Sequence, residues 1–223
     1  MNLSEAIQER HSVRSYLTKA IDGDVKTELL SFIDQCNQES GLHMQLVTDE
    51  PKAFDGFMAH YGKFSGVTNY IALIGKKGKD LEETCGYYGE KVALKAQQLG
   101  LNTCWVALTY SKIKTAFQIG NGEKLCVVIA VGYGKTNGVP HKSKDPQAVM
   151  KAGSSVPDWF QKGVQAALLA PTAMNQQKFM FTLNGDTVTA KAGTGFYTKV
   201  DLGIVKYHFE IGAGTENFSW GAL

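Results

Sequence analysis

The chain has 223 residues, 43% of them hydrophobic, and its 23 Lys and Arg residues nearly balance 21 Asp and Glu residues. This length is sufficient for one sizeable core and short for two, so we expect one compact unit. A formal charge of +2 provides no basic face typical of nucleic-acid binding. Any anion that the protein binds must therefore be held by local groups.

The longest apolar run falls well below a membrane span, and the opening MNLSEAIQER contains acidic residues and no apolar leader segment. The cysteines lie far apart and form no CxxC or His-paired metal pattern; they are Cys36, Cys85, Cys104 and Cys126. We therefore expect a cytoplasmic protein with buried free thiols, no structural metal, and neither a membrane nor a nucleic acid as partner.

Hydrophobic periodicity predicts helices over 3–11, 25–33, 81–99, 157–169 and 198–211, and strands over 42–46, 70–74, 125–131, 179–183 and 187–190. Asn2 and Glu5 have capping-box spacing at the first helix, and Asp22 or Asp24 can cap the second. Gly100 can end the long central helix, and Asn184 with Gly185 indicates a hairpin turn. Residues 132–146 are rich in Gly, Lys and Pro, which predicts an irregular connection.

Two of the predicted helices have the same spacing of glycines, followed by a tryptophan. Gly100 follows Gly89, and Gly214 follows Gly203, at the same interval, with a Trp shortly after each pair. The helix and strand over 29–48 can also be laid over 164–182. Chance similarity between two α/β segments is one explanation. The other is an internal duplication, which predicts two similar halves, residues 1–152 and 153–223, related by a pseudo-twofold axis.

Two glycine motifs follow the strand over 125–131 and fail on spacing. Gly132, Gly134 and Gly138 give GxGxxxG, and the PHKSKDP sequence after them cannot directly open the helix that a dinucleotide pyrophosphate requires. Gly134, Lys135 and Thr136 imitate the end of a P-loop, but position 129 is Ile instead of the first glycine. Neither motif predicts a nucleotide site.

The segment Arg10-His11-Ser12-Val13-Arg14 carries the strongest signal for a ligand. Two guanidinium groups and a hydroxyl can surround a phosphate monoester, and charge-assisted hydrogen bonds of this kind contribute roughly 1.5–3 kcal/mol each. The C-terminal end of a helix repels phosphate by its dipole, so arginines are needed at this position. The alternative is that Arg10 and Arg14 only satisfy the last carbonyls of the helix.

The sequence AIQERHSVRSY resembles the N-terminal signature of FMN-dependent nitroreductases, in which R-x-S-x-R binds the flavin phosphate. ALKAQQLGLNTCW resembles the long central helix of that family, and CVVIAVGYGK resembles its late strand. The resemblance implies an α+β fold in which a mixed β-sheet is flanked by helices. It also implies a basic residue that returns to the phosphate: Lys142, with Lys144 next, although either can be an ordinary loop lysine.

The chain departs from the family in the place of a second motif. Family members have Pro-Ser-x-x-Asn-x-Gln soon after the second helix, where this chain has CNQESGLHMQLV. The motif reappears late, in APTAMNQQKF, as Pro171, Thr172, Asn175 and Gln177. The resemblance then implies that the N-terminal half binds the phosphate and the C-terminal half contacts the flavin ring, as in a family dimer. An ordinary helix-to-strand loop is the alternative, and we favour a monomer that imitates a dimer over a homodimer.

The resemblance further implies that Ala107 and Leu108 pass beside the reactive edge of the ring, although the glycines usual in that region are replaced. We expect FMN as cofactor, NADH or NADPH as electron donor, and a nitroaromatic, quinone or similar small acceptor in a ping-pong cycle. No side chain is assigned as an essential acid or base. A protein that binds or senses FMN without catalysis, a flavin-free interaction module, and an enzyme of different flavin chemistry with residues 51–68 as a lid remain alternatives.

Overall fold

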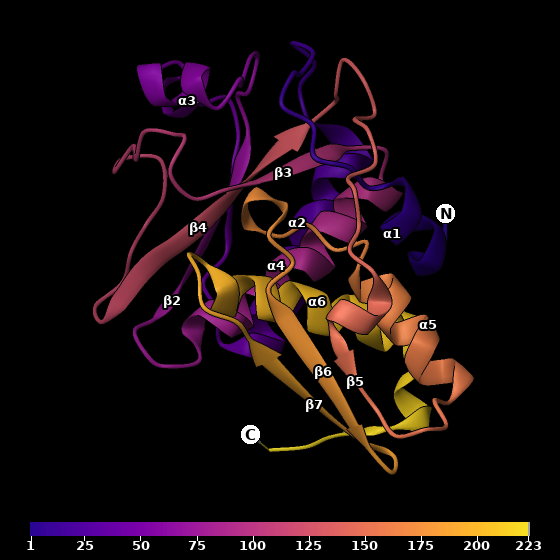
Figure 1. Cartoon of the computed structure of the whole chain (residues 1–223). Coiled ribbons are helices and arrows are strands. Elements are labelled where there is room, and N and C mark those ends of the chain that lie inside the picture. Colours follow the sequence, from indigo (N-terminus) through magenta and orange to yellow (C-terminus); the bar gives the residue numbers. More distant parts are fainter. Residues whose placement is uncertain (223) are drawn as a thin grey trace.

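The computed structural model describes residues 1–222, and its main helices and strands follow the predicted order (Figure 1). Leu223, the last residue of the predicted second half, lies outside the described residues. The helices are α1 (Leu3–Glu9), α2 (Gly23–Ser40), α3 (Phe57–Tyr61), α4 (Leu81–Gln98), α5 (Asp158–Ala167) and α6 (Thr198–Ala213). The strands are β1 (Gln45–Val47), β2 (Tyr70–Lys76), β3 (Asn102–Val106), β4 (Glu123–Gly132), β5 (Met150–Lys151), β6 (Phe179–Asn184), β7 (Thr187–Ala192) and β8 (Ser219–Trp220). The predicted α+β class is confirmed.

The strands form two sheets of four, where we expected one mixed sheet. The first sheet has the order β1-β2-β4-β3 and is antiparallel throughout. The second has the order β5-β6-β7-β8, with an antiparallel β6–β7 hairpin and a parallel strand on each side of it. The irregular connection after β4 leads the chain from one sheet to the other.

The two halves have a similar order of elements. Apart from the short α3, α2-β1-β2-α4-β3 and α5-β6-β7-α6-β8 both run helix, strand, strand, helix, strand. The first two strands are antiparallel neighbours in both halves. This is the order that the repeat predicts, while a common origin of the halves stays a prediction.

Helices α4 and α6 join the two halves (Figure 1). Helix α4 packs on the first sheet, α6 packs on the second, and the two helices pack on each other. A Cβ atom on Gly86 would lie 2.0 Å from the Val200 carbonyl oxygen, and one on Gly203 would lie 2.0 Å from that of Glu83. The helices can therefore approach this closely only because both crossing positions are glycine.

One hydrophobic cluster extends through both halves. It contains Leu73 and Val127 from the first sheet, Phe181 and Val188 from the second, and Phe209 from α6. All five side chains are buried. The two halves thus share one core and are not separately packed bodies.

Residues 51–68 divide their aromatic side chains between the core and solvent. Phe54 and Phe64 are buried and pack edge to face in a second cluster on the outer side of the first sheet. Phe57 and Tyr61 lie on α3 and are 82% and 75% exposed. Core packing therefore accounts for part of this segment, and α3 stands out from the molecule (Figure 1).

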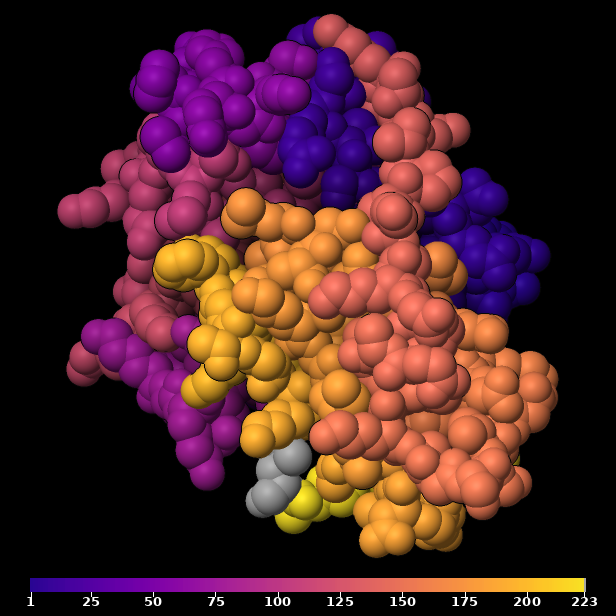
Figure 2. All heavy atoms as spheres, viewed as in Figure 1, coloured from indigo at the N-terminus to yellow at the C-terminus, as the bar shows by residue number. Residues whose placement is uncertain are grey.

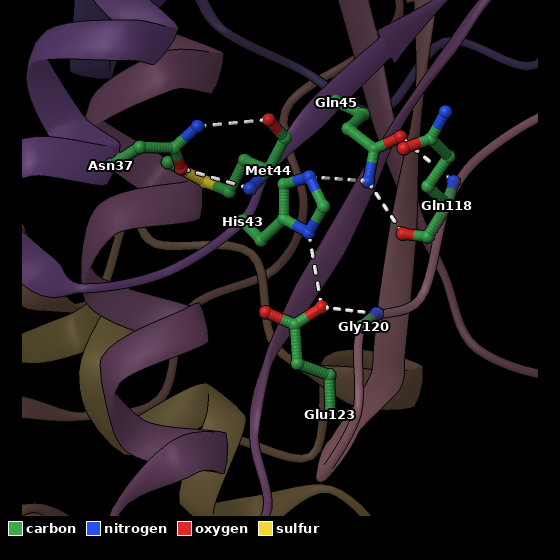
Figure 3. A network of polar contacts seen from close by, with 7 residues as sticks. All are labelled: Asn37, His43, Met44, Gln45, Gln118, Gly120 and Glu123. Atoms are coloured by element: carbon green, nitrogen blue, oxygen red, sulfur yellow. Dashed lines mark hydrogen bonds and ion pairs between the residues drawn. The ribbon is translucent and has the colours of Figure 1, made fainter.

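A polar network fixes strand β1 at the edge of the first sheet (Figure 3). The Asn37 side chain of α2 exchanges two hydrogen bonds with the backbone of Met44, at 2.8 and 2.9 Å. His43 Nδ1 lies 3.0 Å from Glu123 Oε2, and this contact lowers the pKa of the Glu123 carboxyl. Gln45 is bound to Gln118 just before β4. The network holds a three-residue strand that would otherwise have few contacts.

Two broader expectations bear on the whole chain. Cys36, Cys85 and Cys104 are free and buried as predicted, whereas Cys126 is partly exposed. Within residues 1–222, no helix combines the length and hydropathy needed to cross a membrane.

Candidate functional site

A cavity of about 310 Å³ brings the two predicted motifs together. Its lining residues are Arg10, His11, Ser12, Arg14, Val139, Pro140, His141, Pro171, Thr172, Met174 and Asn175. The connection after β4, salmon in Figure 2, runs between the indigo N-terminal segment and the orange C-terminal half. A more open depression, of about 580 Å³, is formed by α2 side chains alone and contains no predicted site residue.

The Arg10–Arg14 segment is held in an extended form beside β3. After α1 ends at Glu9, Ser12 forms a parallel bridge with Thr103, and the Val13 N–H donates to the Thr103 carbonyl at 3.0 Å. Val13 is buried in the second cluster, on the outer side of the first sheet. Alternation along an extended chain places Ser12 and Arg14 on the opposite side from Val13, where both line the cavity.

The loop between α5 and β6 has a strained backbone. Met174, Asn175 and Gln177 have φ values of 53°, 53° and 45°, in the left-handed region that non-glycine residues seldom adopt. Each such residue costs on the order of 1–3 kcal/mol unless its surroundings impose the conformation. Met174 is also 97% exposed. Strain of this kind at the rim of a cavity supports a ligand-binding role for the loop.

Asp201 of α6 stabilises this loop through two hydrogen bonds. Its carboxylate accepts a hydrogen bond from the Ala173 N–H at 2.9 Å and another from Gln176 Nε2 at 2.7 Å. Asp201 is 3% exposed. Burial raises its pKa to about 6, and the two hydrogen bonds oppose that rise.

Gln177 and Asn175 tie the loop to the connection after β4. Gln177 is buried; its Oε1 accepts from the Lys144 N–H at 2.8 Å, and its Nε2 donates to the Lys142 carbonyl at 2.9 Å. Asn175 Nδ2 donates to the same carbonyl at 2.9 Å. The Lys144 ammonium donates to the carbonyls of Gln176 and Gln177 at 2.8 and 2.9 Å. Of these groups, only Asn175 lines the cavity.

The remaining predicted residues lie outside the cavity lining. Ala107 and Leu108 follow β3, with Leu108 66% exposed, and Lys142 is exposed on the connection. The Gln177 side chain is buried and donates a hydrogen bond to the Lys142 carbonyl. Contacts of Ala107, Leu108, Lys142 and Gln177 with a flavin therefore stay predictions.

Arg10 differs from the exposed phosphate ligand that its motif suggests, because only 2% of it is exposed. Its Nε lies 3.5 Å from Glu90 Oε1, and its Nε and Nη1 have no hydrogen-bond partner among the residues that the structure describes. Glu90 accepts from Trp105 Nε1 at 2.8 Å and contacts His208 Nε2 at 2.9 Å. Buried charged donors without an acceptor are costly and suit a site that awaits an anionic ligand.

Sequence reasoning missed Glu90, His208, Asp201 and His141 as parts of this region. Glu90 and His208 occupy the buried faces of α4 and α6, where isolated polar residues interrupt apolar stripes. That interruption was the available signal. His141 lines the cavity, and its Nε2 donates to the Leu168 carbonyl at 2.9 Å. His11, also in the lining, has a pKa lowered by burial and by the neighbouring Arg10.

Comparisons with known proteins bear on the fold and the family of the chain. A family model described as "Putative TM nitroreductase" matches residues 2–213. A "putative nitroreductase" from Thermotoga maritima has 24% sequence identity and a TM-score of 0.64, over 95% of this chain and 83% of that one. A "putative nitroreductase in complex with fmn" from Desulfovibrio desulfuricans has 14% identity and a TM-score of 0.52, over 70% of this chain and 98% of that one.

A comparison with curated proteins gave no match. The structural similarities confirm the nitroreductase-like fold that the sequence resemblance implied. Since the family model spans almost the whole chain, the protein belongs to this nitroreductase family.

Proposed function

We propose that the protein binds FMN in the cavity and passes electrons from NADH or NADPH to a nitroaromatic, quinone or similar small acceptor. The observation that carries the proposal is the set of donors at one end of the cavity. Arg10, Ser12 and Arg14 line this space, and the buried Nε and Nη1 of Arg10 have no acceptor among residues 1–222. These groups fit a phosphate monoester, which offers several strong acceptor oxygens.

The remaining lining fits the rest of a flavin mononucleotide. The cavity volume of about 310 Å³ lies at the lower end of small-molecule sites. Pro171 and Thr172 line the cavity from the loop between α5 and β6, and the exposed Val139 and Met174 offer apolar surface. The similar protein from Desulfovibrio desulfuricans was solved with FMN, which supports the choice of ligand.

Bound FMN would supply the two-electron chemistry, used in turn by the nicotinamide and the acceptor. The chain's own contribution is binding and orientation. Arg10, Ser12 and Arg14 hold the phosphate end, and Asp201 fixes the strained loop that carries Thr172 and Asn175. No side chain is assigned a proton-transfer step.

We further propose that one chain forms one site, with no second copy required. The phosphate donors come from the first predicted half and the loop at 171–175 from the second, and both line a single cavity. Light scattering should then give the mass of a single chain, and titration should give one FMN per chain. A dimer with two flavins would contradict this arrangement.

The first experiment is an absorption spectrum of the purified protein beside thermal melts with and without FMN. Ligand at 100 times its Kd adds about 2.7 kcal/mol to the stability. A raised midpoint followed by NAD(P)H oxidation supports the enzyme. Binding without NADH or NADPH oxidation identifies a non-catalytic flavin protein, and no shift with no colour points to an interaction module.

The phosphate assignment has its own test in Arg14→Ala. Loss of a charge-assisted contact of about 1.5–3 kcal/mol weakens FMN binding by roughly 10- to 100-fold. Riboflavin lacks the phosphate, so its affinity should hardly change in the same variant. Unchanged FMN affinity would remove Arg14 from the site.

A further inference from the structure

Beneath the phosphate end of the cavity lies a buried polar cluster of which the proposed function uses only Arg10. Glu90 of α4 and His208 of α6 are both 0% exposed, and Arg10 is 2% exposed. Trp105 of β3 completes the cluster through its indole N–H. Arg10 is the member that also lines the cavity.

The hydrogen bonds of His208 require a proton in its contact with Glu90. His208 Nδ1 lies 3.2 Å from the Ala166 carbonyl, which can only accept, so Nδ1 carries a hydrogen. His208 Nε2 lies 2.9 Å from Glu90 Oε1. With Nε2 bare and Glu90 ionised, two lone pairs would face each other, so one proton must lie on Nε2 or on the carboxyl oxygen.

Wherever this proton lies, Glu90 and His208 together are neutral, so Arg10 carries the net charge of the cluster. The distance of 3.5 Å from Arg10 Nε to Glu90 Oε1 is too long for a good hydrogen bond, and within residues 1–222 neither Nε nor Nη1 has an acceptor. Tyr207 of α6 is also close enough to Glu90 to be affected by it: burial first, and then Glu90, raise the pKa of Tyr207. Tyr207 therefore adds no charge.

We propose that Glu90 and His208 are positioning residues that share one proton and thereby leave the Arg10 guanidinium free to bind a phosphate group in the cavity. The inference rests on the proposed function for the identity of its ligand. Loss of the shared proton leaves a buried carboxylate next to Arg10. That carboxylate pairs with Arg10 and reduces the positive potential that the guanidinium presents to the cavity, so phosphate binding weakens.

Glu90→Gln is the matched variant, because its amide imitates the proton-bearing carboxyl. The amide oxygen can accept from Trp105, and the amide nitrogen can donate to the bare Nε2 of a neutral His208. This variant has no proton to lose at position 90. The Kd for FMN should therefore match that of the wild type, because the Arg10 guanidinium has no carboxylate charge beside it in this variant.

His208→Gln is the opposing variant, because it leaves Glu90 ionised beside Arg10. We expect FMN binding to weaken by about tenfold or more, and the double variant with Glu90→Gln to recover it. A merely structural role would not produce that rescue. Wild-type affinity in His208→Gln, or a double variant that binds FMN as weakly as His208→Gln does, would overturn the proposal.

Inorganic phosphate separates this inference from the proposed function. If FMN does not bind but phosphate raises the melting temperature of the wild type more than that of His208→Gln, the proposed function fails and the inference stands. If phosphate and FMN both leave the wild-type melt unchanged, Arg10 does not bind phosphate and the inference fails as well.

Discussion

Replacing Asp201 with asparagine separates the effect of its buried charge from the rest of the loop between α5 and β6. In the folded chain, burial raises the pKa of Asp201 from 3.8 to about 6. The folded state therefore keeps this proton more readily than the unfolded state does. The resulting stability is fully present below the ordinary pKa and is lost as the pH rises through about 6.

The magnitude follows from the size of this rise. A difference of roughly two pKa units corresponds to about 3 kcal/mol, which is the cost of holding Asp201 ionised at neutral pH. Asparagine does not titrate. The free energy of unfolding of the wild type should therefore fall by up to about 3 kcal/mol relative to that of Asp201→Asn between about pH 4 and about pH 7. Other titrating groups are common to both proteins and cancel in the difference.

Urea unfolding of both proteins across this pH range measures that difference directly. The variant is expected to have a constant offset as well, since an asparagine Nδ2 cannot accept from Gln176 as the carboxylate does. The offset does not depend on pH, so it leaves the slope interpretable. If the stability of the two proteins changes with pH in parallel, burial does not raise the pKa of Asp201 and the reasoning is refuted.

Two further substitutions test the fold. Gly203→Ala places a Cβ 2.0 Å from the Glu83 carbonyl oxygen, and unfolding by urea should show a loss of about 3 kcal/mol or more; Gly153→Ala, which meets nothing within 4 Å, is the control and should change little. His43 lowers the pKa of Glu123, so the stability from that contact is present above the ordinary carboxyl range and lost as the pH falls through the lowered pKa. In Glu123→Gln, the stability measured by urea unfolding should fall less at acid pH than it does in the wild type. An equal fall in both proteins would contradict this prediction.

Local signals were sufficient for the long elements. The capping box of Asn2 and Glu5 is present at α1, and α4 begins at Leu81 as its apolar stripe predicts. The hairpin turn also lies where predicted, with Gly185 at a φ of 64°. In each case the residues that specify the element lie within it, which is why the sequence alone could locate them.

Short strands were missed because their pairing comes from distant residues. Strand β3 begins with Asn102 and Thr103, which lack an apolar pattern but are buried by pairing with β4 and with the Ser12 segment. Strands β5 and β8 contain two residues each and exist only through their neighbours in the second sheet. No periodicity can be read from so few positions.

The candidate site shows the same division between local motif and long-range contact. The sequence motifs predicted Arg10, Ser12, Arg14 and the loop at 171–175 as site residues, and in the structure they line one cavity. The sequence could not show that Gln177 binds the connection after β4, because that contact joins residues more than thirty positions apart. Nor could it show that Glu90 meets Arg10 and His208, which are brought together only by folding.

The crossing of α4 and α6 links these distant contacts to the site. Glu90 lies on α4 one turn beyond Gly86, and Asp201 and His208 lie on α6 on either side of Gly203. The close approach at the two glycines thus fixes where Glu90 lies relative to Arg10. It also fixes where Asp201 lies relative to the loop that it holds. A ligand held between Arg10 and that loop would bind only when the halves are docked. Its binding energy must therefore also stabilise their contact, and FMN should protect α4 and α6 from hydrogen exchange as well as the residues that it touches.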